Sequence, residues 1–220
     1  MVDHMLIITG GAVDIEWLKS ISPSCFTGKI MAADRGLFYA EQAGLSVDYI
    51  LGDFDSLPAG ILNKYEEKEV LIRTYPPEKD YTDTHLALLW AVEEGAKQVT
   101  IIGGMGTRFD HSFANIGLLS MLLEKGIKGE ILDPHNRIFM MDKDHSGVVK
   151  ITKNRDKNEY ISLIPYTEKV TGITLKGFKY PLQNETLTIG ISRGISNELV
   201  NEEGLIQTEK GTLIVCISND

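Results

Sequence analysis

The first 135 residues alternate short apolar runs with segments of helical periodicity. We expect the apolar runs to be β-strands, at residues 5–9, 29–33, 49–51, 70–75, 99–102 and 130–132. The helical segments lie between them, at residues 15–20, 37–43, 60–67, 82–94 and 113–125. Since parallel strands need long crossovers, this alternation predicts an α/β domain: a parallel sheet with helices on both faces.

After Asp133-Pro134 the pattern changes to short runs rich in β-branched residues, separated by Gly, Asn and Asp. These runs lie at residues 161–165, 170–175, 186–191, 204–208 and 213–217. They are typical of a small antiparallel domain, a sandwich or partial barrel without helices. We therefore expect an α/β domain over residues 1–135 and a smaller all-β, sandwich-like domain over residues 136–220.

Charge and composition narrow the classes of partner. The formal charge is −9 and no run of five or more Lys or Arg occurs, which argues against a nucleic-acid partner. Cys25 and Cys216 lie far apart, so neither a disulfide framework nor a zinc site is indicated. No apolar stretch approaches the roughly 20 residues that cross a bilayer. We expect a soluble cytoplasmic protein with no membrane partner.

The unusual residues follow the predicted strands of the first domain. Thr9-Gly10-Gly11 follows the first strand, Asp34-Arg35-Gly36 the second and Asp53-Phe54-Asp55 the third. A glycine-rich segment, residues 103–111, follows the strand at 99–102. In open parallel sheets ligands bind at the carboxyl ends of the strands, so this edge is the predicted site.

Two acids after the third strand are candidate metal ligands. Asp53 and Asp55 point to the same side of an extended segment, because side chains alternate. With Asp34 and Asp83 they form an oxygen-rich set that suits Mg²⁺, which also binds substrate phosphates. The alternative is that Gly-Asp-x-Asp-Ser only forms a capped turn before a helix.

The segment Lys79-Asp80-Tyr81-Thr82-Asp83 precedes the amphipathic helix at 82–94. Asp80 and Asp83 are three residues apart and share a face if the turn is helical. Either acid is also suited to capping the helix and complementing its dipole. Lys79 fits capping less well, and a phosphate contact is the alternative.

The glycine-rich segment and the helix after it form a third candidate site. Glycines such as Gly104 permit close backbone approach, and Arg108 offers a fork of donors to phosphate oxygens. The alternatives are a tight turn and a surface ion pair between Arg108 and Asp110. His111 is as well explained by a surface hydrogen-bonding role, and Asn115 lies further along the helix.

Several motifs are absent. The sequence has no G-x-x-x-x-G-K-[ST] and no third glycine of a dinucleotide fingerprint after Gly104-Met105-Gly106. It also lacks the G-x-S-x-G of serine hydrolases.

The ordered set of motifs resembles thiamine pyrophosphokinase over nearly the whole chain. The matching segments are Ala33-Asp34-Arg35-Gly36, Gly52-Asp53-Phe54-Asp55-Ser56, Lys79-Asp80-Tyr81-Thr82-Asp83, residues 103–115 and Gly194-Ile195-Ser196-Asn197-Glu198, with Val170-Thr171-Gly172 and residues 175–182 between them. The resemblance implies an α/β catalytic domain, a β domain and a homodimer with active sites between subunits. It also implies transfer of the β,γ-pyrophosphoryl group of ATP to the thiamine hydroxyl, releasing AMP.

The resemblance also implies roles for individual residues. Those for Mg²⁺ are Asp34, Asp53, Asp55 and Asp83; those for ATP and its phosphates are Asp34, Arg35, Lys79, Gly104, Arg108, Asp110, His111 and Asn115. The catalytic set is Asp53, Asp55, Asp80 and Asp83, of which Asp55 or Asp80 would accept the hydroxyl proton; thiamine would contact Thr82, Ser196 and Asn197. Two departures are Thr107, where the family often has glycine, and the lack of a tryptophan in the β domain to stack on thiamine.

Two other functions are considered. A phosphohydrolase of haloacid dehalogenase type would use Asp53 and Asp55 as nucleophile and acid. That family carries its D-x-D on the first strand with Thr or Val at the fifth position, whereas here the motif follows the third strand and Leu57 stands there. The other function is a non-catalytic nucleotide or thiamine sensor, for which a full acidic site would be superfluous.

Overall fold

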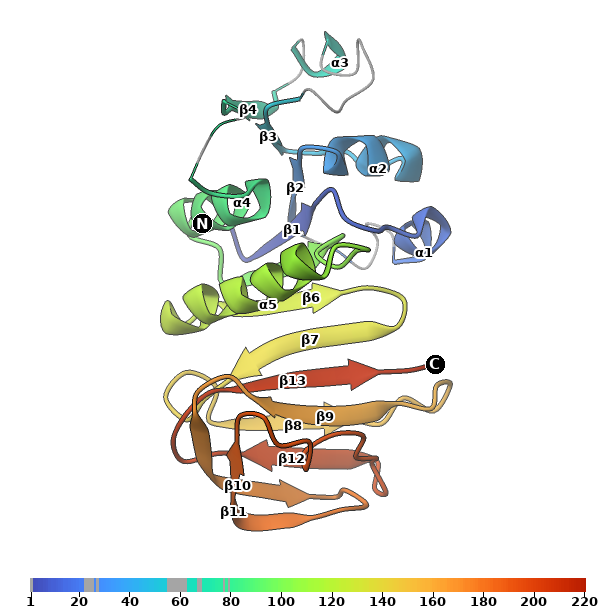
Figure 1. Ribbon diagram of the computed structural model, residues 1–220. Helices are drawn as coiled ribbons and strands as arrows, with labels where there is room; N and C mark the ends of the chain where they lie inside the picture. Colours follow the sequence, from blue (N-terminus) through green and yellow to red (C-terminus); the bar gives the residue numbers. More distant parts are fainter. Residues whose placement is uncertain are drawn as a thin grey trace. The chain divides into compact units, whose positions relative to one another are not determined.

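The computed structural model describes residues 2–21, 26, 28–54, 63–66, 69–76, 78 and 80–220. The chain divides into two compact units, Met1–Pro134 and His135–Asp220 (Figure 1). No helix of the described residues is long and apolar enough to cross a membrane.

The first unit is built on a parallel sheet with strand order β4-β3-β2-β1-β5-β6. Its strands are β1 (His4–Ile8), β2 (Lys29–Ala33), β3 (Tyr49–Gly52), β4 (Leu71–Thr74), β5 (Gln98–Ile102) and β6 (Lys128–Leu132). Its helices are α1 (Ile15–Ser20), α2 (Gly36–Ala43), α3 (Asn63–Glu66), α4 (Asp83–Glu93) and α5 (Phe109–Glu124). The predicted parallel α/β architecture is therefore confirmed.

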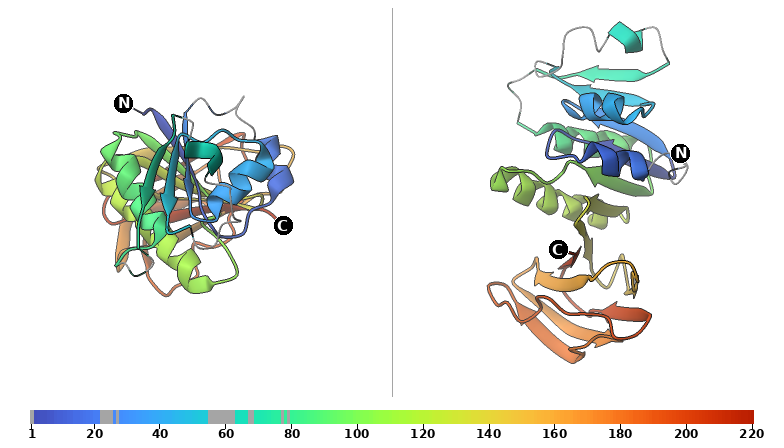
Figure 2. Two further views of the ribbon diagram at one scale, coloured as in Figure 1. Left: turned by 90° about the horizontal axis from the view of Figure 1, so that it is seen from above. Right: turned by 90° about the vertical axis from the view of Figure 1, so that its right-hand side faces the viewer.

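Helices cover both faces of this sheet. Helix α1 contacts α2, α4 contacts α5, and both α2 and α4 contact β2. Figure 2 shows the blue pair, α1 and α2, and the green pair, α4 and α5, on opposite sides of the strands. Ile8 and Ile30 face the core under α2, whereas Tyr49 on the other face meets the Trp90 ring edge-on at 5.1 Å. The central strands β1, β2, β3 and β5 are consequently buried on both faces, as parallel strands usually are, whereas the edge strand β4 is mostly exposed.

The strand order creates a topological switch point at β1. From β1 the chain adds β2, β3 and β4 on one side, then crosses to add β5 and β6 on the other. The connections after β1 and β5 therefore leave the sheet in opposite directions. A crevice for ligands is expected between the carboxyl ends of these two strands.

The second unit consists of two antiparallel sheets around one apolar core. One sheet has the order β7-β13-β9 and the other β11-β10-β12-β8. The strands are β7 (Asn136–Met141), β8 (Val148–Thr152), β9 (Tyr160–Pro165), β10 (Lys169–Lys176), β11 (Leu182–Thr188), β12 (Glu203–Gln207) and β13 (Leu213–Ser218). Leu163 and Val215 of one sheet and Ile173 and Ile206 of the other are fully or almost fully buried in that core. The predicted sandwich-like β architecture is confirmed.

The sequence-based boundaries need correction in places. Strands β7 and β8 were not predicted, and β11 begins four residues before the predicted run at 186–191. Strands β8 and β11 lie at the edges of their sheet and each has a single buried residue, so their apolar signal is weak. Helix α5 begins at Phe109 rather than at the predicted Phe113. Its first turn was missed because residues 109–111 are exposed and carry no apolar periodicity. Of the predicted helix at 60–67, only residues 63–66 lie within the described residues, and they are helical.

Candidate active site: a cleft at the carboxyl ends of the strands

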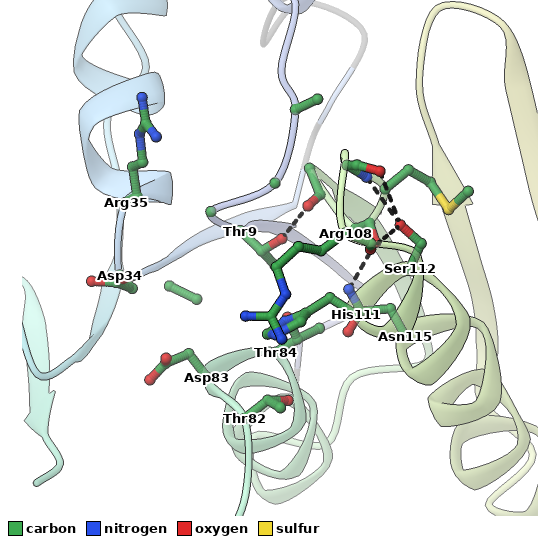
Figure 3. A pocket seen from close by; sticks show the side chains of 18 of the residues that line it. Thr9, Asp34, Arg35, Thr82, Asp83, Thr84, Arg108, His111, Ser112 and Asn115 are labelled. Atoms are coloured by element: carbon green, nitrogen blue, oxygen red, sulfur yellow. Dashed lines mark hydrogen bonds between the residues drawn. The ribbon is translucent and has the colours of Figure 1, made fainter. Parts of the chain in front are cut away.

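A cleft of about 470 Å³ opens where the topological switch point predicts it (Figure 3). Its walls are the segments after β1, β2 and β5 together with the starts of α4 and α5. The lining residues are Thr9–Ala12, Ala33–Arg35, Tyr39, Thr82–Thr84, Gly103–Arg108, His111, Ser112 and Asn115. Three of the sequence motifs, those at residues 33–36, 79–83 and 103–115, therefore contribute to one cavity.

The floor of the cleft is a tight contact between the segments after β1 and β5. The Gly11 amide donates to the Gly103 carbonyl at 3.0 Å, and the Thr9 hydroxyl donates to the same oxygen at 2.6 Å. A Cβ atom on Gly11 would lie 2.1 Å from that oxygen. Gly103 itself has φ +74° and its Cβ would lie 2.6 Å from the Thr9 carbonyl oxygen. Glycine is therefore required at both positions by close backbone approach.

Helices α2, α4 and α5 all begin at the cleft. Arg35, Thr82 and Arg108 are the residues that precede their first turns, and all three line the cavity. The Thr82 hydroxyl caps α4 by accepting from the His85 amide at 3.3 Å. The sequence analysis had considered Asp80 or Asp83 for this capping role. The positive end of each helix dipole favours an anion in the cleft.

Two half-buried carboxylates, Asp34 and Asp83, stand in the same cavity. Asp34 adopts a left-handed conformation, with φ 49°, and its amide donates to the Leu51 carbonyl at 2.7 Å. A non-glycine residue in that region carries backbone strain, which is commonly found at functional sites. An anion bound in this cleft would be repelled by the two carboxylates. Its binding therefore requires a cation that bridges them, or protonation of a carboxylate.

The remaining predicted acids are placed differently. Asp53 is half-buried at the end of β3, where a Cβ on Gly52 would lie 3.1 Å from the Asp34 Cα. Among the described residues, Asp53 and the exposed Asp80 do not line the cleft. Asp55 and Lys79 lie outside the described residues. Within the part of the chain that is described, no three Asp, Glu, His or Cys side chains are grouped closely enough to hold a metal alone.

Side chains of α5 shape the loop that follows β5. Asn115 is buried and donates from Nδ2 to the Gly104 carbonyl at 2.7 Å. The Ser112 hydroxyl accepts from the Gly106 amide at 3.1 Å and contacts the Arg108 carbonyl oxygen at 3.1 Å. These bonds fix the backbone of the loop, so Asn115 both shapes the loop and lines the cleft.

Charged side chains line the mouth of the cleft. The exposed Arg108 makes a two-point ion pair with Asp110, with distances of 2.6 Å from Nη2 and 3.2 Å from Nε. Hydrogen bonding from Arg108 lowers the pKa of Asp110 to about 2. Arg35 lies over the Tyr39 ring at 5.5 Å, and the exposed His111 lines the wall.

Sequence reasoning placed Thr9-Gly10-Gly11 at this edge of the sheet without giving these residues individual roles, and all three line the cleft. It missed Tyr39, Thr84 and Ser112, which also line the cleft. These three carry no sequence mark of their own because ordinary Thr, Tyr and Ser residues occur throughout the chain.

Ser196 and Asn197 lie in a turn of the second unit that is tightly held. The buried Asn197 amide oxygen accepts from the backbone N–H of Tyr180 at 3.0 Å and of Glu198 at 2.9 Å, and its Nδ2 donates to the Tyr180 carbonyl at 2.8 Å. Ser196 is exposed and left-handed, with φ 57°, and its amide donates to the Ser162 hydroxyl at 3.0 Å. The Asn197 side chain thus fixes the Tyr180 backbone, while Tyr180 as a whole is 59% exposed.

Fold and cleft together define a two-unit α/β protein with a polar cleft at the switch point of a parallel sheet and an additional β-sandwich unit. Models of two domains match the chain: "Thiamin pyrophosphokinase, catalytic domain" over residues 27–131 and "Thiamin pyrophosphokinase, vitamin B1 binding domain" over residues 148–213. The chain belongs to the thiamine pyrophosphokinase family, as the sequence motifs predicted.

Individual relatives support this membership. Thiamine pyrophosphokinase of Bacillus subtilis is 37% identical over 190 residues, which cover 86% of this chain and 87% of that protein. The crystal structure of thiamine pyrophosphokinase from Bacillus subtilis superposes with a TM-score of 0.88 at 33% identity, covering 99% and 100% of the two chains. Yeast thiamin pyrophosphokinase, at 18% identity and a TM-score of 0.76, covering 100% of this chain and 87% of that one, shares the fold.

Proposed function

We propose that this protein transfers the pyrophosphoryl group of ATP to the hydroxyl of thiamine, giving thiamine diphosphate and AMP. The observation that carries the proposal is the cleft in which three helix starts converge around the carboxylates of Asp34 and Asp83. Family membership supplies the identity of the two substrates.

In this proposal the polyphosphate of ATP occupies the cleft. Backbone amides at the starts of α4 and α5 donate to phosphate oxygens, as helix N-termini do for anions. Arg108 and Arg35 approach from opposite walls, and the Gly103-Gly104 backbone permits a close fit because no side chain intervenes. His111 and Asn115 complete the wall of α5, and Lys79 is retained as a phosphate contact from the sequence.

The donor set fits Mg²⁺ rather than a softer metal, because the available ligands are carboxylate oxygens. Asp34 and Asp83 would hold it from the cleft, with Asp53 and Asp55 completing the set proposed from the sequence. Mg²⁺ commonly uses one or two carboxylates together with substrate phosphates and waters, so a group of three protein ligands is not required. When bound, the ion neutralises charge on the phosphates and so favours attack by an oxygen nucleophile.

The reaction proposed is an in-line displacement at the β-phosphorus. The thiamine hydroxyl oxygen forms the new bond to that atom, the bond to the oxygen bridging the α- and β-phosphorus atoms breaks, and AMP leaves. The hydroxyl proton passes to a carboxylate, for which Asp55 or Asp80 is proposed. The residues of the cleft act mainly by aligning the reacting groups and stabilising charge.

Thiamine is proposed to contact Thr82 in the first unit and Ser196 and Asn197 in the second. The strained, exposed Ser196 supports a ligand-binding role for this turn. We further propose a cytoplasmic homodimer with active sites between subunits, as the family resemblance implies. Light scattering in solution tests the dimer: a monomer mass at working concentration contradicts it.

The activity is tested by incubating the protein with ATP, Mg²⁺ and thiamine and following phosphorus NMR. Equal yields of AMP and thiamine diphosphate are expected. Phosphate release without thiamine, together with inhibition by beryllofluoride, would instead support the phosphohydrolase. Binding of ATP and thiamine with no product would support the sensor.

A further inference from the structure

Asp110 was expected to contact ATP or its phosphates, but the cleft is lined by Arg108 and, among the described residues, not by Asp110. Figure 3 shows the Arg108 side chain extending into the cleft near the start of α4. Asp110 stands one residue inside α5, in its first turn, with 65% of its side chain exposed. The carboxylate and the cleft are therefore connected through the guanidinium of Arg108.

The geometry of this ion pair leaves one edge of Arg108 for a ligand. An arginine has five N–H donors in a planar fork. Asp110 takes one from Nε and one from Nη2. The second hydrogen of Nη2 and one hydrogen of Nη1 point along the other edge, which faces away from Asp110. Two donors on one edge match two oxygens of a phosphate group.

A direct contact between Asp110 and the polyphosphate is disfavoured, since both are anions and like charges repel. The start of α5 stabilises a carboxylate in its first turn whether or not Arg108 is present, so Asp110 is held in place before any ligand binds. The pair is exposed, and its attraction alone contributes little to folding. Its effect is to restrict a long side chain that would otherwise lose rotational freedom on binding.

We infer that Asp110 is a positioning residue: it holds Arg108 by one edge so that the other edge is presented to the phosphates of the nucleotide. The inference deepens the proposed function, on which the identity of the anion rests. It reassigns Asp110 from a ligand contact to a residue that acts through Arg108.

A double-mutant cycle tests this role, with ATP affinity measured by calorimetry in Mg²⁺ without thiamine. The variants are Asp110→Asn, Arg108→Lys and the double variant, with Asp144→Asn in an exposed turn of the second unit as the matched control. Asp110→Asn should weaken ATP binding about three- to fivefold, the upper part of the range of exposed ion pairs. In the Arg108→Lys background it should have less than about a twofold effect, because a lysine cannot present two edges at once.

Equal losses in both backgrounds would overturn the inference, since Asp110 would then act independently of Arg108. Tighter ATP binding by Asp110→Asn would overturn it too, because the carboxylate would then only repel the phosphates. Steady-state kinetics add a second readout: the KM for ATP should rise while the KM for thiamine stays constant, and Asp110→Glu should restore most of the loss. If the wild-type chain binds ATP but forms no thiamine diphosphate, the proposed function fails while the cycle remains measurable; absence of ATP binding would overturn both.

Discussion

The cleft of the first unit and the Ser196–Asn197 turn of the second differ in how they offer groups to a ligand. In the cleft, helix starts and glycine backbone form the wall and leave space between them. In the turn, the conspicuous polar side chain, Asn197, is engaged with the Tyr180 backbone, and the exposed residues are Ser196 and Tyr180. Polar groups thus line the wall of the cleft, whereas in the turn the Asn197 side chain is buried beneath the surface.

This difference teaches what each region contributes to specificity. Amides, arginines and carboxylates suit any polyphosphate with a hard cation, so the cleft defines a reaction class. In the proposed function, the rigid turn with its strained serine contributes shape, and so selects thiamine as the acceptor. Substitutions in the cleft should therefore change nucleotide use and turnover, whereas substitutions in the turn should change thiamine use.

The largest effect is expected for Asp83→Asn in the cleft. Losing this half-buried carboxylate should lower kcat/KM at least about 100-fold, because charge on the transferring group is no longer offset through Mg²⁺. The variant should stay folded by circular dichroism, and Asp144→Asn, an exposed acid in the second unit, should retain full activity. Full activity of Asp83→Asn at low Mg²⁺ would remove this acid from the proposed metal set.

Gly103→Ala and Gly44→Ala separate backbone strain from close approach. Both glycines are left-handed, with φ +74° and +71°, but a Cβ at Gly103 meets the Thr9 carbonyl at 2.6 Å, whereas one at Gly44 meets nothing within 4 Å. Gly44→Ala should cost about 1 kcal/mol of unfolding free energy from strain alone. Gly103→Ala should cost about 2–3 kcal/mol more and weaken ATP binding, since the cleft floor must shift. Equal losses in urea unfolding would show that the floor is not tightly packed.

Two neighbouring substitutions in the turn should separate positioning from contact. Asn197→Ala leaves the Tyr180 N–H and C=O without their partner and should cost about 2 kcal/mol of stability while raising the KM for thiamine. Ser196→Gly suits the left-handed backbone, so stability should be retained while the KM for thiamine rises about tenfold through loss of the hydroxyl. The KM for ATP should stay constant in both; a rise in that constant would remove the distinction between the two regions.

The smallest effect concerns pH. The pKa of Asp110 is lowered to about 2 by its bond to Arg108, so the carboxylate is ionised in the folded protein at any pH well above 2. Because the pKa is lowered, the stabilising effect of the ionised Asp110 on its pair with Arg108 is fully present above the ordinary pKa of 3.8. It is lost as the pH falls toward 2. ATP affinity should therefore show no step from this pair between about pH 5 and 8. A step that disappears in Asp110→Asn would contradict the assignment.

The sequence predicted the architecture well because the apolar strand runs and the helical spacing of apolar residues are both strong where residues are buried. Strands such as β1 and β5 are continuous apolar runs, and the glycines and acids follow them at one edge. It failed at β8 and β11, whose single buried residues leave little pattern, and at the first turn of α5, which is exposed. Boundaries at edges and surfaces are set by neighbours that sequence spacing does not reveal.

The site residues that were predicted are those whose residue type is unusual at the end of a strand. Asp34, Arg108 and Gly104 were recognised because charge and glycine are unusual at strand ends. Thr9 was placed at this edge but its bond to the Gly103 carbonyl was not foreseen, and Ser112 was not recognised, since both roles depend on backbone partners that only the fold creates. The use of the Asn197 amide to hold Tyr180 was equally invisible, because the two residues are 17 positions apart.

The most direct test of the central claim is a single reaction of the wild-type protein with ATP, Mg²⁺ and thiamine, followed by phosphorus NMR. We predict that AMP and thiamine diphosphate appear in equal amounts and that omission of either Mg²⁺ or thiamine abolishes both. Formation of ADP and thiamine monophosphate, or turnover that is unchanged without Mg²⁺, would contradict it.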